Sequence, residues 1–355
     1  MKKRIKRLWQ LVDEKTEGML ITSAENVRYL CGFSGTEGSI FITRREGFFL
    51  TDGRYTTQAR EQVTGLAVRT FREKVKGIAS IIKKLRVRSV GYEARSLTVA
   101  FLKDIEKEIP GITLKPYSDS LDLLRTIKDA AEITLLKKAA HIAALSLTQV
   151  MPLIRPGVRE IEIAAELEYR IRKNGGEGPS FPFIVASGFR GALPHGVASQ
   201  KKIAAGDFVV VDYGAIYSGY ASDETCTFVV GRPTRKQKKI YAIVREAHDR
   251  AIAALKPRQS LKVIDGAARN YIEKQGYKKY FNHGTGHGIG LAVHEPPRVS
   301  FLSDATALEG MVITIEPGIY LPGWGGVRIE DTVVVTKKGS KIITEMNKSL
   351  TVLDS

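Results

Sequence analysis

Cysteine, long apolar runs and an export signal are scarce or missing in this chain of 355 residues. Its two cysteines, Cys31 and Cys226, lie far apart and lack metal-ligand spacing, which argues against a disulfide framework and fits a reducing compartment. No segment approaches the ~20 consecutive apolar residues that a membrane span requires. The N-terminus is basic but lacks the apolar core and cleavage site of a signal peptide. We therefore expect a cytoplasmic protein with no membrane partner.

Histidine is absent from the first part of the chain, because all six histidines lie at position 141 or later. That part contains short apolar segments at 39–43 and 47–51, and helical patterns around 78–85 and 99–108. Their alternation predicts a small α/β domain, within an α/β (α+β) chain. We place the domains at 1–125 and 126–355, and we expect the chemistry in the second.

Negative charge is in the minority, since 38 acidic residues face 55 basic ones and the net charge is +17. Such an excess can mark a nucleic-acid binder. No basic motif interleaved with aromatic residues accompanies it, however. We therefore favour an ordinary solvated basic surface and expect no nucleic-acid partner.

The second domain contains an internal repeat with an offset of 101 to 107 residues. The segment GDFVVVDYG, which contains Asp212, corresponds to GMVITIEPG, which contains Glu316. Likewise, DET beginning at Asp223 corresponds to EDT beginning at Glu330. Each copy is expected to form two helices and then two strands that carry carboxylates. Two such copies packed about a pseudo-twofold axis would bring four carboxylates face to face.

The first carboxylate pair, Asp212 and Asp223, is predicted on two strands joined by a four-residue hairpin loop at 216–219. In that register the two aspartates pair directly, with Cβ atoms ~4.5–5.5 Å apart. They would repel unless a cation lies between them. A single pair of this kind would favour a solvated acidic patch, and the second copy is what favours a metal site.

The second pair is Glu316, at the end of an apolar strand, and Glu330. An acid in such a strand is costly unless it is paired or metal-bound. By strand alternation, Arg328 and Glu330 share one face, so Arg328 is expected to reach the same cavity.

Three of the six histidines, His283, His287 and His294, fall within the glycine-rich segment HGTGHGIGLAVHE. The many glycines argue against a helix and allow close backbone approach. His195 alone would be an ordinary loop histidine, but beside the others it becomes a candidate for substrate contact. Four carboxylates and one imidazole suit Mn²⁺, Co²⁺ or Zn²⁺. Two such ions ~3.5–4 Å apart would activate water and polarise a carbonyl.

At these residues the chain resembles the pita-bread metallopeptidases, and within them the Xaa-Pro dipeptidases (prolidases) and Xaa-Pro aminopeptidases. The segment 283–295 is similar to their signature H-G-x-G-H-x-x-G-x-x-V-H-E. The segments NVRYLCGFSG at 26–35 and LTDGRY at 50–55 resemble the creatinase-like N-terminal domain of that family. The resemblance implies a pita-bread catalytic domain, hydrolysis of the bond between an N-terminal residue and proline, and a homodimer.

The resemblance also implies a role for each candidate residue. Two divalent ions, Mn²⁺ first and Co²⁺ or Zn²⁺ as alternatives, would be held by Asp212, Asp223, His287, Glu316 and Glu330. Catalysis would use Glu316, as proton acceptor for the attacking water, with His195 and His294. Substrate contacts would come from His195, His283, His294, Arg298 and Arg328.

Three functions follow, in this order: an Xaa-Pro aminopeptidase that also accepts dipeptides, a strict Xaa-Pro dipeptidase, and, more distantly, a non-catalytic pseudo-peptidase that binds a partner. Methionine aminopeptidases resemble only the second domain, and creatinase-like relatives lack the metal set. One departure from the family pattern D-x-T-R-T is Cys226, which stands where arginine is usual. By alternation Cys226 points away from Asp223, so it is not expected to be a ligand.

Overall fold

The computed structural model describes residues 2–118 and 120–354. The chain forms two compact units, Met1–Arg125 and Thr126–Ser355, and each is described by itself. Among the described residues, no helix is both long and apolar enough to cross a bilayer.

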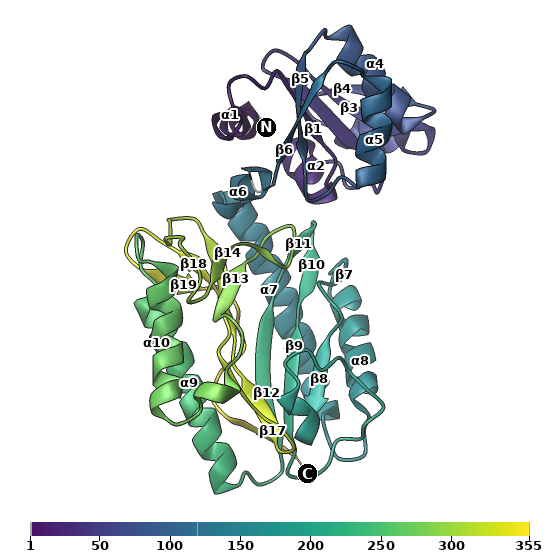
Figure 1. Ribbon diagram of the computed structural model, residues 1–355. Helices are drawn as coiled ribbons and strands as arrows, with labels where there is room; N and C mark the ends of the chain where they lie inside the picture. Colours follow the sequence, from purple (N-terminus) through teal and green to yellow (C-terminus); the bar gives the residue numbers. More distant parts are fainter. Residues whose placement is uncertain (1, 119, 355) are drawn as a thin grey trace. The chain divides into compact units, whose positions relative to one another are not determined.

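Unit 1 is a six-stranded mixed sheet with helices (Figure 1). Its helices are α1 (Lys2–Leu11), α2 (Ala24–Cys31), η1 (Gly53–Tyr55), α3 (Thr56–Gln62), α4 (Lys74–Lys84), α5 (Val99–Glu108) and α6 (Ser120–Thr126). Its strands are β1 (Gly18–Ile21), β2 (Ser39–Thr43), β3 (Gly47–Asp52), β4 (Ala67–Phe71), β5 (Ser89–Glu93) and β6 (Thr113–Tyr117), in the order β4-β3-β2-β1-β5-β6. Helix α4 packs Ile78 and Ile82, four residues apart on one helical face, against Phe41 and Leu50 of the sheet.

Unit 2 places two helix pairs around smaller sheets. Its helices are α7 (Ala130–Val150), η2 (Met151–Leu153), α8 (Glu160–Lys173), η3 (Gly188–Ala192), α9 (Arg235–Ala254), α10 (Leu261–Lys274) and η4 (Lys278–Tyr280). Strands of the first half are β7 (Gly178–Pro179), β8 (Ile184–Ser187), β9 (Phe208–Tyr213), β10 (Ala215–Tyr217), β11 (Tyr220–Ala221) and β12 (Glu224–Val230). Strands of the second half are β13 (Gly286–Gly288), β14 (Glu295–Val299), β15 (Val312–Ile315), β16 (Gly318–Leu321), β17 (Gly325–Arg328), β18 (Asp331–Val335), β19 (Ser340–Ile342) and β20 (Thr351–Leu353).

The internal repeat is present in the fold of unit 2. Helices α7 and α9 each begin with a capping box, formed by Asp129 with Glu132 and by Thr234 with Gln237. The strand pairs β9–β12 and β15–β18 are both antiparallel, and they belong to a four-stranded and a five-stranded sheet. In Figure 1, α7 and α8 lie on one side of these strands, and α9 and α10 lie on the other. The predicted two-copy architecture is confirmed.

The hairpin that carries the first two aspartates has a different register from the predicted one. Asp212 lies opposite Thr225, not opposite Asp223. The loop has two residues instead of four, because Ser218 (φ 47°) and Gly219 (φ 76°) both adopt positive φ, as a tight hairpin turn requires. Asp223 is therefore displaced by two residues along the strand, which keeps it on the same face as Asp212.

Each unit contains one buried cysteine. Cys31 lies on α2 of unit 1, and Cys226 lies on β12 of unit 2. Burial raises the pKa of the Cys31 thiol to about 11 and that of the Cys226 thiol to about 12.

Candidate active site

The four carboxylates of the repeat and one histidine converge in unit 2. Asp212 lies in β9, Asp223 directly before β12, and Glu330 between β17 and β18, and all three are buried. His287 lies in β13, and its Nε2 is 3.6 Å from Asp223 Oδ2 and 3.4 Å from Glu316 Oε1. One ligand atom each from Asp223, His287 and Glu330 lies within 4.8 Å of the others. Residues up to 118 positions apart in the sequence thus meet in one cluster.

The carboxylates are buried close together and repel one another, and the positive charge of Arg328 offsets only part of this repulsion. Burial, and then the charges of Glu330 and Asp212, raise the pKa of the Asp223 carboxyl well above its ordinary value. Burial, and then the charges of Glu316 and Asp212, do the same for the pKa of Glu330. Among the described residues, none donates a hydrogen bond to Asp212 Oδ1 or Glu330 Oε1, although both atoms are buried. Partnerless, buried carboxylate oxygens of this kind fit divalent cations as their ligands.

His287 has the tautomer that a metal ligand needs. Its Nδ1 is 3.0 Å from the carbonyl oxygen of Gly288, so Nδ1 carries the proton and donates it. The Nε2 lone pair therefore faces Asp223 and Glu316. Burial lowers the pKa of His287, which keeps the ring neutral. A neutral imidazole with its free nitrogen directed at carboxylates is suited to metal ligation.

Strand alternation predicts that Arg328 reaches the same cavity as Glu330, and in the structure Arg328 contacts Asp212. Its Nη2 is 2.5 Å from Asp212 Oδ2, and its Nη1 donates to the carbonyl oxygen of Pro194 and to the Tyr320 hydroxyl. The Tyr320 hydroxyl in turn lies 2.9 Å from His283 Nε2. No motif in the sequence selects Tyr320, since its only signal is a position four residues after Glu316. Arg328 thus contacts Asp212, the backbone directly before His195 and, through the Tyr320 hydroxyl, His283.

Two other predicted histidines are exposed. His195 follows Pro194, and the ring of His294 lies 4.3 Å from that of His287, measured between centroids. The pKa of His294 is lowered, first because neighbouring atoms partly shield its ring from water and then because it lies beside His287. A neutral ring beside the carboxylate cluster can donate a hydrogen bond to a substrate.

Comparisons with known proteins agree with this geometry. Residues 134–337 match the model of metallopeptidase family M24, and residues 4–127 match the creatinase/prolidase N-terminal domain. The chain belongs to metallopeptidase family M24. The predicted family, fold class and metallo-exopeptidase activity are confirmed.

Similar proteins span nearly the whole M24 chain. An Xaa-Pro dipeptidase of Pyrococcus horikoshii is 42% identical over 99% of both chains. An Xaa-Pro dipeptidase from Bacillus anthracis is 43% identical, with a TM-score of 0.96 over 99% of both chains. An X-Pro aminopeptidase from Thermotoga maritima is 35% identical, with a TM-score of 0.91 over 98% of this chain and all of the other.

Two buried acids that the sequence did not reveal, Glu295 and Asp265, hold the histidine loops of this M24 peptidase. Lys128 Nζ is 2.9 Å from Glu295 Oε2, and Glu295 also accepts a hydrogen bond from the Ala292 amide. Asp265 accepts from Thr285. Lys128 and Glu295, and likewise Asp265 and Thr285, lie far apart in the sequence, so no local pattern predicts these contacts. Together they fix the backbone that carries His287 and His294.

A third buried acid, Glu160, supports the segment that leads to His195. It accepts from the amides and hydroxyls of Ser187 and Ser199 and pairs with Arg190 at 2.9 Å. Each histidine segment therefore has its own buried acid as an anchor.

Arg298 lies in β14, where its backbone pairs with His287. Its side chain is exposed, and no hydrogen bond or ion pair joins it to another described residue. Arg298 is therefore available to a ligand, although the structure does not bring it into contact with the carboxylates.

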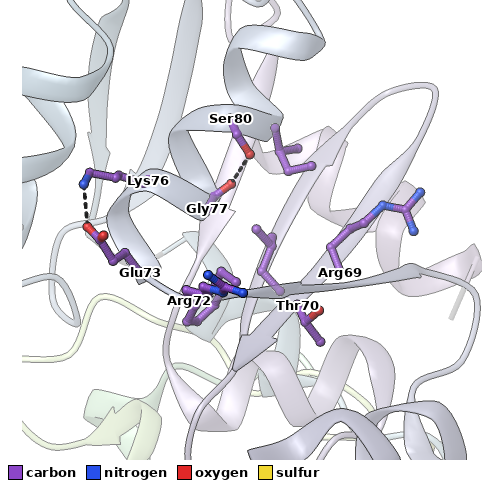
Figure 2. Close-up of a pocket in the computed structure, with 10 residues that line it drawn as sticks. Arg69, Thr70, Arg72, Glu73, Lys76, Gly77 and Ser80 are labelled. Atoms are coloured by element: carbon purple, nitrogen blue, oxygen red, sulfur yellow. Dashed lines mark hydrogen bonds and ion pairs between the residues drawn. The ribbon is translucent and has the colours of Figure 1, made fainter. Parts of the chain in front are cut away.

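A cavity of about 340 Å³ in unit 1 lies away from these residues in the sequence (Figure 2). Its lining comes from 50–81 and includes Arg69, Arg72 and Lys76. Lys76 is paired with Glu73 at 2.8 Å, and none of the candidate site residues takes part. This cavity is not the active site predicted from the sequence.

Proposed function

We propose that this M24 metallopeptidase is an Xaa-Pro dipeptidase that hydrolyses the bond between an N-terminal residue and a C-terminal proline. The supporting observation is the cluster of Asp223, His287 and Glu330, with Glu316 and Asp212 close enough to interact with it. Two buried carboxylate oxygens of this set, Asp212 Oδ1 and Glu330 Oε1, lack donors among the described residues. Similar proteins that cover 99% of the chain carry the name Xaa-Pro dipeptidase. The proposal reverses the order expected from the sequence, in which the aminopeptidase came first.

In the proposed reaction, each candidate residue has a distinct role. Bound at the cluster, divalent ions would polarise the scissile carbonyl and lower the pKa of a water molecule. Glu316 would take the proton of that water, because burial raises the pKa of its carboxyl and Thr314 orients its Oε1. His294 and His195 would donate hydrogen bonds to the carbonyl oxygen as charge develops there. Asp223 and Glu330 would bridge the two ions.

Recognition of the free proline carboxylate is assigned to Arg298 in this proposal. Its guanidinium is exposed, and it has no carboxylate partner among the described residues. A guanidinium can bind a carboxylate through two parallel hydrogen bonds. His283, held by Tyr320, and Arg328 would line the same side of the site.

The second candidate function is an Xaa-Pro aminopeptidase, favoured by the likeness to the Thermotoga maritima enzyme. An aminopeptidase has to leave the proline side open for a longer chain. The exposure of Arg298 is compatible with that requirement as well, so only substrate length separates the two functions.

Three further properties belong to the proposal. We expect two ions per chain, with Mn²⁺ ahead of Co²⁺ and Zn²⁺, because the ligand set is rich in hard oxygen donors. We also expect a homodimer that works in the cytoplasm.

The test is hydrolysis of Ala-Pro and of Ala-Pro-Pro-Ala by EDTA-treated enzyme reloaded with Mn²⁺ or Co²⁺. We expect no hydrolysis without metal, and a higher kcat/KM for Ala-Pro with metal. Faster cleavage of the tetrapeptide would favour the aminopeptidase. Full activity in a metal-free preparation would contradict both candidates.

A further inference from the structure

A buried lysine lies behind the two strand segments that carry the candidate bridging acids. Lys348 precedes β20, which pairs in parallel with β12, and its side chain is only 4% exposed. Its Nζ is 2.5 Å from Glu224 Oε1 and 3.5 Å from Asp331 Oδ1. The same Nζ is 3.6 Å from Cys226 Sγ. One ammonium group thus contacts an acid from each copy of the repeat.

Those two acids are the direct neighbours of the candidate metal ligands. Glu224 follows Asp223, and Asp331 follows Glu330, with the same offset of 107 residues. Successive residues in extended backbone point to opposite sides. The bridging acids therefore face the metal cluster, while Glu224 and Asp331 face Lys348. The cation occupies a central position between two pseudo-equivalent acids.

The surroundings of Glu224 and Asp331 make Lys348 the group that joins them. Glu224 Oε2 accepts from the Tyr213 hydroxyl at 2.8 Å. Asp331 Oδ1 accepts from the Thr344 hydroxyl at 2.5 Å, and Asp331 Oδ2 lies 3.1 Å from His248 Nε2. These partners each serve one acid. Without the ammonium, the buried carboxylates of Glu224 on β12 and Asp331 on β18, strands of two different sheets, would have no shared positive charge.

The strands also touch on the metal side, so their spacing affects the ligands directly. Thr225 Oγ1 donates to Glu330 Oε2 at 2.7 Å, and Thr332 Oγ1 donates to the carbonyl oxygen of Asp223 at 2.7 Å. Each threonine thus lies two residues after one bridging acid and contacts the other. A change in the separation of the strands would move Asp223 and Glu330 relative to each other.

We propose that Lys348 is a positioning residue for the metal centre, because it fixes the distance between the strand segments that carry Asp223 and Glu330. Lys348 Nζ also lies beside Cys226 Sγ of β12, so the ammonium contacts two residues of the first strand segment. The inference rests on the proposed metallopeptidase function but not on the choice between dipeptide and longer substrates.

The experiment compares Mn²⁺ binding to metal-free protein, by isothermal titration calorimetry, in wild type, Lys348→Met and Lys348→Arg. We expect Lys348→Met to weaken Mn²⁺ binding by about 10–100-fold, the range found for residues that orient metal ligands from behind. Lys348→Arg, which keeps the charge, should retain most of the affinity. With saturating Mn²⁺, Lys348→Met should lower kcat for Ala-Pro more than it changes KM.

The matched control is Leu167→Ala, a cavity variant in the buried face of α8. It should lower Tm while leaving Mn²⁺ affinity unchanged, which separates positioning from general stability. If Lys348→Met binds Mn²⁺ as tightly as Leu167→Ala does, the inference is wrong. If wild type itself binds no Mn²⁺, the proposed function fails instead.

A second variant decides the question if Lys348→Met does not fold. Glu224→Gln/Lys348→Met removes one negative and one positive charge together, so no new unpaired charge is buried beside Tyr213. The link between the strands is still lost, and Mn²⁺ affinity should fall as in the single variant. Affinity equal to that of wild type in this folded double variant would overturn the inference.

Discussion

The two copies of the repeat in unit 2 share a backbone plan but contribute different chemistry. The first copy supplies two aspartates, Asp212 and Asp223, and an exposed histidine, His195. The second supplies two glutamates, Glu316 and Glu330, together with a glycine-rich loop that carries three histidines. The symmetric part of the fold thus gathers negative charge, and the asymmetric loop of the second copy adds the imidazoles. Duplication explains the convergence of acids, and divergence of the loops explains the candidate catalytic groups.

The largest effect should come from removing one bridging acid from either copy. Asp223→Asn and Glu330→Gln should each reduce metal content and activity together, by more than the ~10–100-fold expected for a residue that only orients a ligand. Metal content per chain and kcat/KM for Ala-Pro measure this. Asp304→Asn, which changes an exposed ion pair with Lys262, is the control. Normal turnover with two bound metals in either acid variant would show that the ligand assignment is wrong.

Substituting one histidine from each copy, His294 and His195, tests whether both copies contribute catalytic groups. His294→Ala should lower kcat by ~10²–10³-fold for both dipeptide and tripeptide substrates, because its proposed partner is the carbonyl oxygen common to both. His195→Ala should act in the same direction. Metal content should stay normal in both variants, as neither ring is a proposed ligand. Loss of metal from His294→Ala would instead make His294 part of the metal centre.

A smaller and substrate-selective effect is expected from substitution of Arg298, a residue of the second copy that has no proposed counterpart in the first. If it binds the proline carboxylate, Arg298→Ala should cost ~1.5–3 kcal/mol of transition-state binding on Xaa-Pro. The effect on Xaa-Pro-Yaa should be much smaller, because its carboxylate lies further along the chain. The measurement is kcat/KM on both substrates. Equal losses on the two would remove Arg298 from carboxylate recognition.

The smallest effect concerns pH and thermal stability. The pKa values of Asp223 and Glu330 are raised in the folded, metal-free protein, so protonation of these acids stabilises the folded state at low pH. That stabilisation is lost as the pH rises through the raised pKa values. Bound metal removes this penalty, so the Tm difference between loaded and metal-free protein should grow as the pH rises above the ordinary carboxyl range, by ~2–4 °C per kcal/mol. Asp223→Asn should flatten this dependence. A difference independent of pH would contradict the proposed carboxylate ligands.

Local patterns predicted much of this molecule. Helix α5 (99–108) and the strands of the repeat follow from hydrophobic spacing, and the second copy predicts that Asp223 and Glu330 meet. The hairpin register was missed, because nothing in the sequence requires Ser218 to adopt positive φ. The contributions of Tyr320 and Lys348 were missed as well, since both depend on contacts with residues distant in the chain. Periodicity describes one element at a time, whereas these contacts depend on how several elements pack.

The burial of one cysteine in each unit gives this molecule two built-in reporters of local opening. The thiols of Cys31 and Cys226 are shielded, and their raised pKa values keep the nucleophilic thiolate scarce at neutral pH. Labelling by a disulfide reagent should therefore proceed only through transient exposure of the surrounding element. The labelling rate of Cys31 would follow opening of unit 1, and that of Cys226 would follow opening around β12. A single population of molecules would thus yield two independent free energies of opening.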